Sequence, residues 1–228
     1  MSNDFFRFKK FTIKQSHCAM KVGTDGTLLG AWANGGSSIL DVGTGTGLIA
    51  LMMAQRFPDA EVTGIDIDDE ACLQALENVT NSPYDLNILH KNLADMDGTF
   101  QSIVSNPPFF DVSLQSPDKK RTLARHTLTL SYHDLMEHSW RLLTNDGELS
   151  VIIPAEWKSK LESEALLTGF FKSRECAIKT TPKKNTRRYL LAYRKHPVET
   201  VEIDEEVLEI APNVKSEWYA QITQDFYL

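Results

Sequence analysis

The stretch "SSILDVGTGTGLIALMMAQRF" at residues 37–57 decides the fold. Its first seven residues are mostly apolar, include β-branched side chains and end in glycine, which predicts a buried strand over 37–43. Residues 46–57 predict a helix. Glycines at 43, 45 and 47 lie between the two and allow the backbone to turn tightly and to approach a ligand closely. We therefore expect a strand, a glycine-rich turn and a helix in succession.

The spacing of these glycines excludes two common kinds of ligand-binding loop. A dinucleotide-binding loop would need glycine or alanine at position 48, where the chain has Leu48, and no Gly-Lys-Ser/Thr follows to make a phosphate-binding loop. The pattern "LDVGTGTG" (40–47) resembles instead the loop of class I S-adenosylmethionine-dependent methyltransferases. Glycine-rich turns also occur without a ligand. The resemblance implies cofactor contacts at Asp41, Gly43, Gly45 and Gly47.

Strand-like and helix-like segments alternate along the rest of the chain. We expect strands over 60–68, 86–93, 100–106 and 147–154, helices over 69–81, 131–147 and 155–170, an antiparallel hairpin within 171–195, and a last helix over 216–227. Alternation of this kind indicates a parallel sheet. The predicted fold is Rossmann-like α/β, a mostly parallel seven-stranded sheet with helices on both faces and an antiparallel edge hairpin.

Length and composition narrow the class further. The 228 residues suffice for one sizeable α/β domain, which we expect to consist of an N-terminal extension (1–35), a core (36–196) and a C-terminal tail with a helix (197–228). No apolar run approaches a membrane span, and the N-terminus does not resemble a signal peptide. Cys18, Cys72 and Cys176 are far apart and lack C-x-x-C spacing, so we expect reduced thiols in a cytoplasmic protein, with no metal site.

Charge is distributed unevenly. The net charge is −7, yet residues 172–195 hold nine basic residues and one acid, which is +8 and leaves −15 for the rest. Such asymmetry indicates a basic face for a polyanion, and Lys183, Lys184, Arg187 and Arg188 are its candidate RNA-binding residues. The alternative is a solvated, lysine-decorated hairpin that protects a sheet edge from aggregation.

The stretch "SNPPFF" (105–110) follows a predicted strand. Two prolines remove two N–H donors and fix two φ angles, so this turn is stiff and cannot continue a sheet ladder. It either ends the strand and does nothing more, or it holds an amide, a carbonyl and an aromatic ring in fixed positions. The turn resembles the (N/D)-P-P-(Y/F) motif of methyltransferases that modify planar amino groups.

That resemblance implies a chemical role for three residues. The Asn106 side-chain oxygen and the Pro107 carbonyl would accept the two N–H bonds of an amino group, which frees its lone pair and aims it at the donor methyl. Phe109 would offer a face on which an extruded base stacks.

Acids and amides after the predicted strands complete the candidate cofactor site. Asp66 ends the second strand, where a carboxylate can accept hydrogen bonds from both hydroxyls of a ribose, although a surface acid or helix cap is the alternative. The methyltransferase resemblance implies a third contact near the cofactor adenine. Asn92 or Asp95 would supply it.

Nearly the whole chain resembles one family. "FTIKQSHCAMKVGTDGTLLGAWA" (11–33), the glycine loop and "IVSNPPFF" together resemble the tRNA1(Val) adenine-37 N6-methyltransferases, although the fourth motif residue there is more often Tyr than Phe. The resemblance implies S-adenosyl-L-methionine as cofactor and tRNA as partner, with no DNA, no membrane and no oligomer implied. It further implies that Lys21 and Thr24 meet the cofactor carboxylate, that Asp25 meets its ammonium, and that Arg121 and Arg125 face RNA phosphate.

Other functions share these motifs. A methyltransferase of a ribosomal RNA base amino group and a protein glutamine methyltransferase use the same turn, although the latter usually carries an N-terminal helical domain. A nonenzymatic RNA-binding protein would not need the intact turn and glycine loop. Leu48 disfavours a nicotinamide oxidoreductase.

Overall fold

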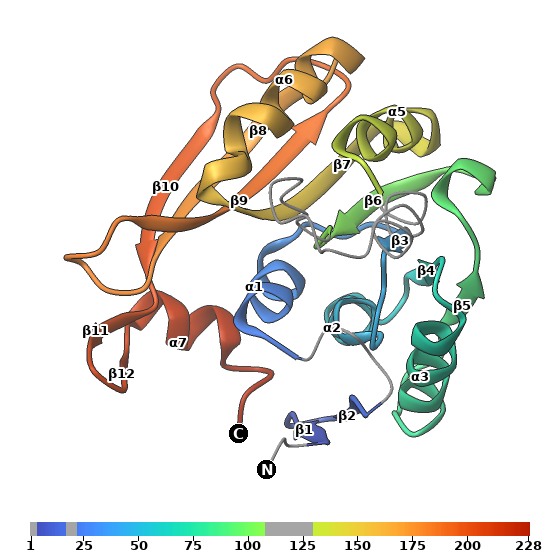
Figure 1. Ribbon diagram of the computed structural model, residues 1–228, viewed down its shortest axis with the longest axis horizontal. Helices are drawn as coiled ribbons and strands as arrows, with labels where there is room; N and C mark the ends of the chain where they lie inside the picture. Colours follow the sequence, from blue (N-terminus) through green and yellow to red (C-terminus); the bar gives the residue numbers. More distant parts are fainter. Residues whose placement is uncertain (1–3, 17–21, 108–129) are drawn as a thin grey trace, which may run out of the picture.

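The computed structural model describes residues 4–16, 22–107 and 130–228, and an eight-stranded sheet forms its centre (Figure 1). The strand order is β10-β8-β9-β7-β6-β3-β4-β5. Within this sheet β9 pairs antiparallel with both neighbours, and all other neighbours pair in parallel. The strands are β3 (Ser38–Val42), β4 (Glu61–Asp66), β5 (Asn87–His90), β6 (Phe100–Ser105), β7 (Leu143–Pro154), β8 (Phe171–Lys179), β9 (Thr186–Arg194) and β10 (Glu202–Val207).

The predicted fold class is confirmed, but the predicted strand count of seven is wrong. The eighth strand is β10, which comes from the expected tail and pairs in parallel with β8, so the β8–β9 hairpin is not the outer edge. Its sequence "EIDEEV" is mostly acidic and lacks an apolar face. It pairs with β8 through backbone hydrogen bonds and through contacts such as the Lys179–Glu205 ion pair. A hydrophobic pattern in the sequence cannot predict interactions of this kind.

Helices cover both faces of the sheet (Figure 1). On one face lie α1 (Thr24–Trp32), α2 (Leu48–Arg56), α3 (Asp69–Thr80) and α7 (Glu217–Thr223), and on the other lie α5 (Tyr132–Leu142) and α6 (Lys158–Thr168). We did not predict α1, because Gly26 and Gly30 lower its helix propensity. A Cβ at Gly30 would lie 2.9 Å from the Met52 Cβ, so this glycine lets α1 pack directly on α2.

The strands alternate between two hydrophobic cores. Ile39 of β3 faces α1 and α2, whereas its neighbour Leu40 faces α5 and α6, and both are fully buried. In β7, Ile152 belongs to the first core and Val151 to the second. Burial on both faces is the usual state of a parallel sheet and explains why its strands read as continuous apolar runs.

One predicted boundary shifts. The helix expected over 131–147 ends at Leu142, and β7 begins at Leu143. Leu143 is buried and pairs with Phe100 of β6, so the sheet takes residues that the sequence pattern assigned to the helix. Two short 3-10 helices, η1 (Leu93–Asp95) and η2 (Ala155–Trp157), follow β5 and β7.

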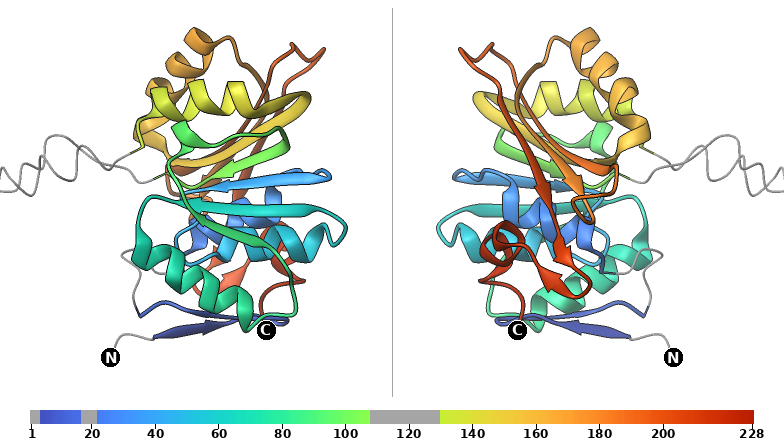
Figure 2. Two further views of the ribbon diagram at one scale, coloured as in Figure 1. Left: turned by 90° about the vertical axis from the view of Figure 1, so that its right-hand side faces the viewer. Right: turned by 90° about the vertical axis from the view of Figure 1, so that its left-hand side faces the viewer.

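The N-terminal hairpin and the C-terminal residues lie side by side (Figure 2). The hairpin β1 (Phe5–Arg7) and β2 (Thr12–Lys14) lies beside the C-terminal residues, where the Lys9 N–H donates to the Phe226 carbonyl at 2.8 Å. A second small hairpin, β11 (Glu209–Ala211) and β12 (Val214–Lys215), precedes α7. Cys72 and Cys176 are buried free thiols, and Cys18 lies outside the described residues. No helix in the described residues is both long and apolar enough to span a bilayer.

Candidate active site

The glycine loop joins β3 to α2. Gly43, Gly45 and Gly47 have φ angles of +71°, +55° and +79°, a region that side chains rarely adopt. A Cβ at Gly43 would meet no atom within 4 Å, and one at Gly45 would meet only the Gly43 carbonyl oxygen at 3.9 Å. One at Gly47 would lie 3.3 Å from the Ala75 Cβ. The first two glycines therefore border open space, whereas the third lets α2 start against α3.

The Asp66 carboxylate is hydrogen-bonded to the glycine loop. It is the last residue of β4, and its Oδ2 accepts the Gly45 N–H at 2.9 Å while its Oδ1 accepts the Asp68 N–H at 3.0 Å. The N-cap of α3 is Asp68, whose side chain accepts from the Glu70 N–H, so Asp66 is not the helix cap. The carboxylate is partly exposed and keeps free lone pairs for further donors.

Asp41 lies beneath the loop, inside β3. Its Oδ2 accepts from the Thr44 hydroxyl at 2.7 Å and from the Ala50 N–H at 3.1 Å. Its Oδ1 has no partner among the described residues, and the residue has no exposed surface. Burial raises the pKa of the Asp41 carboxyl to about 7, against the hydrogen bonds from Thr44 and Ala50, which lower it. Asp41 thus braces the loop and the first turn of α2 from below.

The Asn-Pro turn begins beside the glycine loop. Val42 of β3 pairs with Ser105 of β6, and the Ser105 hydroxyl donates to the Val42 carbonyl at 2.9 Å. Asn106 and Pro107 follow directly. The Asn106 Oδ1 is buried and accepts no hydrogen bond from any described residue. An orphaned buried acceptor is costly in a protein, and it marks a place where a ligand donor fits. Phe109 lies outside the described residues.

The remaining cofactor candidates lie at the ends of β5 and α1. Asn92 and Asp95 are exposed at η1, and the Asn92 Oδ1 accepts the Ala94 N–H at 3.0 Å. Thr24 is exposed in the first turn of α1, and Lys21 lies outside the described residues. The carboxyl ends of β6, β3, β4 and β5, which are neighbours in that order, thus carry in a row Asn106, the glycine loop, Asp66 and Asn92. With strands about 4.8 Å apart, that row suits an elongated ligand.

Asp25 and Arg188 contact each other. The predicted partner of Asp25 was the cofactor and that of Arg188 was RNA, but the Arg188 Nε donates to the Asp25 Oδ2 at 2.6 Å. Beside the pair is a hollow of about 140 Å³ between α1 and the β8–β9 hairpin, which Thr24 and Arg187 also line. Arg188 lies opposite Pro154 at the carboxyl end of β7. The Asp25–Arg188 pair therefore lies at the same end of the strands as Asn106, the glycine loop and Asp66.

The basic segment is less basic in the structure than in the sequence. Five of its nine cations form ion pairs, namely Lys172 with Glu162 and Glu175, Arg174 with Glu148 and Glu202, Lys179 with Glu205, Arg188 with Asp25, and Arg194 with Glu148. Lys183, Lys184 and Arg187 are exposed at the β8–β9 turn, and no described acid pairs with them. Arg121 and Arg125 lie outside the described residues.

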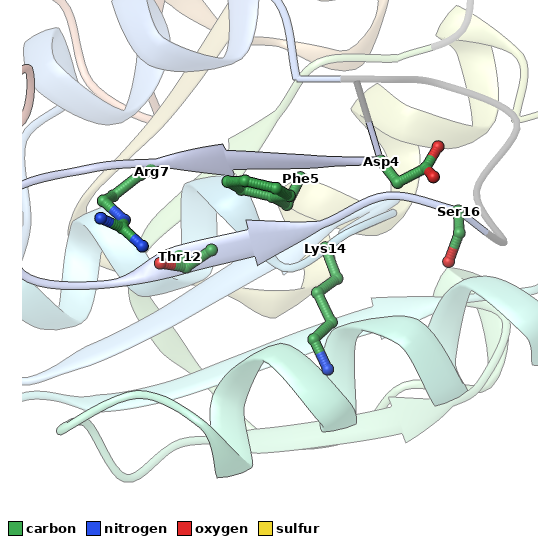
Figure 3. Close-up of a pocket in the computed structure, with 6 residues that line it drawn as sticks. All are labelled: Asp4, Phe5, Arg7, Thr12, Lys14 and Ser16. Atoms are coloured by element: carbon green, nitrogen blue, oxygen red, sulfur yellow. The ribbon is translucent and has the colours of Figure 1, made fainter. Parts of the chain in front are cut away.

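A larger hollow, of about 370 Å³, runs along the N-terminal hairpin (Figure 3). Its lining residues are Asp4, Phe5, Arg7, Thr12, Lys14 and Ser16, none of which sequence analysis placed in a site. On α5, the half-buried Asp134 and His138 and the exposed Glu137 place one ligand atom each within 4.8 Å of one another. Exposed acidic groups of this kind are common without an ion, so we assign no function to either feature.

Sequence analysis missed Asn78. It is 1% exposed on α3, and its side chain accepts the Lys14 N–H at 2.8 Å and donates to the carbonyls of Lys14 and Thr46, both at 2.9 Å. It therefore ties strand β2 to the glycine loop. The available signal was a polar residue on the apolar face of the predicted helix, next to Val79 and in line with Ala75.

Comparison with known families agrees with this arrangement. The family described as "Methyltransferase small domain" matches residues 23–184. A protein of Parabacteroides distasonis named tRNA1(Val) (adenine(37)-N6)-methyltransferase is 45% identical, over all of this chain and 99% of that protein. Proteins of the same name from Trichodesmium erythraeum and Mannheimia succiniciproducens are 40% and 41% identical, over 100% and 98% of this chain and 99% and 94% of theirs.

Solved structures share the fold. A predicted O-methyltransferase, protein Atu636 from Agrobacterium tumefaciens, superposes with a TM-score of 0.69 at 16% identity, covering 89% of this chain and 96% of that one. TrmN from Thermus thermophilus gives 0.55 at 22% identity, covering 75% of this chain and 47% of that one. At these identities the likeness shows the fold alone.

The sheet, the open glycine loop and the carboxylate after β4 define a class I S-adenosylmethionine-dependent methyltransferase. With relatives 39–45% identical along nearly their whole length, the chain belongs to the tRNA1(Val) (adenine(37)-N6)-methyltransferase family.

Proposed function

We propose that this chain transfers the methyl group of S-adenosyl-L-methionine to the N6 amino group of adenine 37 in tRNA1(Val). The observation that carries the proposal is the Asn106 Oδ1, a buried acceptor without a partner among the described residues, one strand away from the glycine loop. The substrate follows from the names of the full-length relatives.

The residues present fit the cofactor. The backbone at Gly43 and Gly45 leaves open space that any side chain would fill, and Asp66 keeps acceptor capacity for the ribose hydroxyls. Asn92 or Asp95 would face the adenine, and Asp41 supports the loop from the interior. When bound, the cofactor supplies an electrophilic methyl group on a sulfonium.

Asn106 and Pro107 prepare the amine. The lone pair of an exocyclic amino group is delocalised into the base, which makes the nitrogen a poor nucleophile. The Asn106 side-chain oxygen and the Pro107 carbonyl accept its two N–H bonds, favour a pyramidal nitrogen and align the lone pair with the methyl. The nitrogen would bond to the methyl carbon as the methyl–sulfur bond breaks, which leaves a neutral thioether. The nitrogen would become positively charged and then release one proton to water, so no general base is needed beforehand. Phe109 provides the face on which the extruded adenine stacks.

The tRNA backbone approaches from the hairpin side. Lys183, Lys184 and Arg187 supply positive charge at the β8–β9 turn that no described acid pairs with, and we propose that Arg121 and Arg125 also contact RNA phosphate. Arg188 contributes through its ion pair with Asp25, which fixes the hairpin against α1. Asp25 is therefore shared between the hairpin and the predicted contact to the cofactor ammonium. The protein acts in the cytoplasm, where tRNA is modified.

The test is methyl transfer from radiolabelled S-adenosyl-L-methionine into an unmodified transcript of tRNA1(Val). Digestion and nucleoside mass spectrometry should detect N6-methyladenosine. A transcript in which guanine replaces adenine 37 is the matched control and should take no label. If the cofactor binds but the tRNA stays unlabelled, the proposed substrate is wrong. Ribosomal RNA and protein glutamine would then be tested in its place.

A further inference from the structure

Three aromatic residues that the proposed reaction does not use gather near the carboxyl end of β7. Tyr132 begins α5, Trp157 ends η2, and Tyr189 lies in β9. The rings of Tyr132 and Trp157 meet edge to face, with their centroids 6.3 Å apart. Trp157 and Tyr189 are partly exposed, and each has a lysine ammonium over its ring, Lys160 at 5.3 Å and Lys158 at 4.8 Å.

The strand that leads to Trp157 pairs with the strand that leads to the Asn-Pro turn. Val151 of β7 pairs with Ser105, the residue before Asn106. β7 then continues for three residues, about 10 Å at 3.3 Å per residue, before η2 begins. In the strand order β9-β7-β6-β3 (Figure 1), β9 with Tyr189 and β7, which leads to Trp157, lie on one side of β6, and β3, which leads to the glycine loop, lies on the other. A base held at Asn106 would therefore have the cofactor on one side and this cluster on the other.

The charges around the cluster suit single-stranded RNA. Lys160 is exposed and no described acid pairs with it, whereas Lys158 is paired with Glu162 and Glu175. Arg187 is exposed two residues before Tyr189. Glu156 is the one acid within the described segment 155–161, and it is exposed. Aromatic rings interleaved with free cations are the usual means by which proteins bind unpaired nucleotides, through stacking and phosphate contacts together.

We propose that Trp157 is a stacking platform for a nucleotide neighbouring the target adenine. The inference rests on the proposed function and extends it to a second RNA subsite. A cation over an exposed ring is held weakly. A base stacked on the ring would displace the Lys160 ammonium, which then pairs with the adjoining phosphate. The subsite accepts any base, because every base has a π face, and it favours a loop over a duplex.

Trp140 provides an internal control. It also is partly buried against the same hydrophobic core as Trp157, and it also has an ammonium over its ring, that of Lys195 at 5.3 Å. However, Trp140 lies near the end of α5 and packs edge to face on Phe170. Both residues lie where β7 and β8 begin, which is the end of the strands away from Trp157. A role in packing alone would make the two tryptophans equivalent, whereas a role in RNA binding distinguishes them.

The experiment is a fluorescence titration of the full chain with the unmodified tRNA1(Val) transcript. Stacking of a base on an indole quenches its emission, so we expect quenching in the native protein and in Trp140→Phe but not in Trp157→Phe. We also expect Trp157→Ala to bind the transcript about tenfold more weakly. Its affinity for S-adenosyl-L-methionine, measured by calorimetry, should be unchanged.

Other outcomes would overturn the proposal. Equal quenching in Trp157→Phe and the native protein would do so, as would native tRNA affinity in Trp157→Ala. If Trp157→Ala fails to fold, the fluorescence comparison of the two Phe variants decides. Methyl transfer by the native protein is measured alongside. Transfer without Trp157-dependent quenching overturns this inference alone, and quenching without transfer supports the subsite while refuting the proposed reaction.

Discussion

Arg188 of β9 and Asp25 of α1 are joined by an ion pair of 2.6 Å, although 163 positions separate them along the chain. The pair links the hairpin expected to meet RNA with the helix expected to meet the cofactor. Both side chains are about one quarter exposed, 28% for Arg188 and 26% for Asp25, so the pair itself stabilises the fold by only about 1 kcal/mol. Its main effect is on charge, because Asp25 neutralises Arg188, which lies opposite Pro154 at the carboxyl end of β7.

Arg187 and Arg188 should therefore differ in their effect on RNA binding. Each phosphate contact contributes roughly 0.7–0.9 to the slope of log affinity against log salt. We expect Arg187→Gln to lower that slope by about one such contact and Arg188→Gln to lower it by clearly less. Filter binding of the tRNA transcript at several salt concentrations measures both slopes. Equal reductions in the two variants would show that Asp25 does not neutralise Arg188.

Asn106→Ala should abolish the chemical step. It removes an acceptor that we assign to the amino group in the transition state, a loss that typically costs at least about 100-fold in rate. The variant keeps the glycine loop and Asp66, so its affinity for S-adenosyl-L-methionine should stay close to native. Single-turnover methyl transfer and calorimetry separate the two quantities. Equal losses of rate and cofactor affinity would contradict the assigned role.

Gly45→Ala should mainly weaken cofactor binding, whereas Gly47→Ala should mainly lower the stability of the fold. Both residues have positive φ, which costs an alanine about 1–2 kcal/mol of stability. The methyl group at position 45 would project into the open space over the loop, so we expect cofactor affinity to fall at least about tenfold. The methyl group at position 47 would press on Ala75 and should lower the free energy of unfolding further. Urea unfolding and calorimetry test the pair. A Gly45→Ala variant that binds the cofactor normally would place the cofactor elsewhere.

Asp41 should make stability depend on pH. Burial raises the pKa of the Asp41 carboxyl in the folded protein to about 7, from an ordinary value of 3.8. The folded state therefore holds a proton that the unfolded state releases, so stability falls as pH rises between about 4 and 7. Relative to Asp41→Asn, which cannot titrate, the native protein should lose about 2 kcal/mol between pH 5 and pH 7. Urea unfolding at several pH values measures both. Parallel curves for the two proteins would contradict the shifted pKa.

The sequence predicted the fold where hydrophobic pattern and glycine spacing act locally. Residues 37–57 formed the expected strand, turn and helix, with observed bounds of Ser38–Val42 and Leu48–Arg56. It failed where long-range packing decides. The helix α1 forms because Gly30 meets Met52, and β10 is a strand because β8 offers it an edge. Neither partner is visible from the segment itself.

Some features of the candidate site could likewise be predicted from the sequence, and others could not. The positions of Asp66 and Asn106 were predictable, because each comes at the carboxyl end of a parallel strand and these ends lie together. The neutralisation of the basic segment was not, since the acids outside the segment that pair with it come from four other elements, α1, β7, α6 and β10. Asn78 was also hidden, because its function depends on where β2 runs. Counting charges along a chain overstates a basic surface whenever other segments supply the acids.

The meeting of the chain ends has a consequence for synthesis. The N-terminal hairpin bonds to Phe226, its Phe8 ring stacks on Tyr227 with centroids 5.8 Å apart, and Asn78 connects the same hairpin to the glycine loop. During synthesis, residues 5–14 can therefore make these contacts only after residues 226 and 227 have been added to the chain. The central sheet can form earlier, because its strands all lie before residue 208. Until then the hairpin that Asn78 ties to the glycine loop lacks its partners from the C-terminal segment.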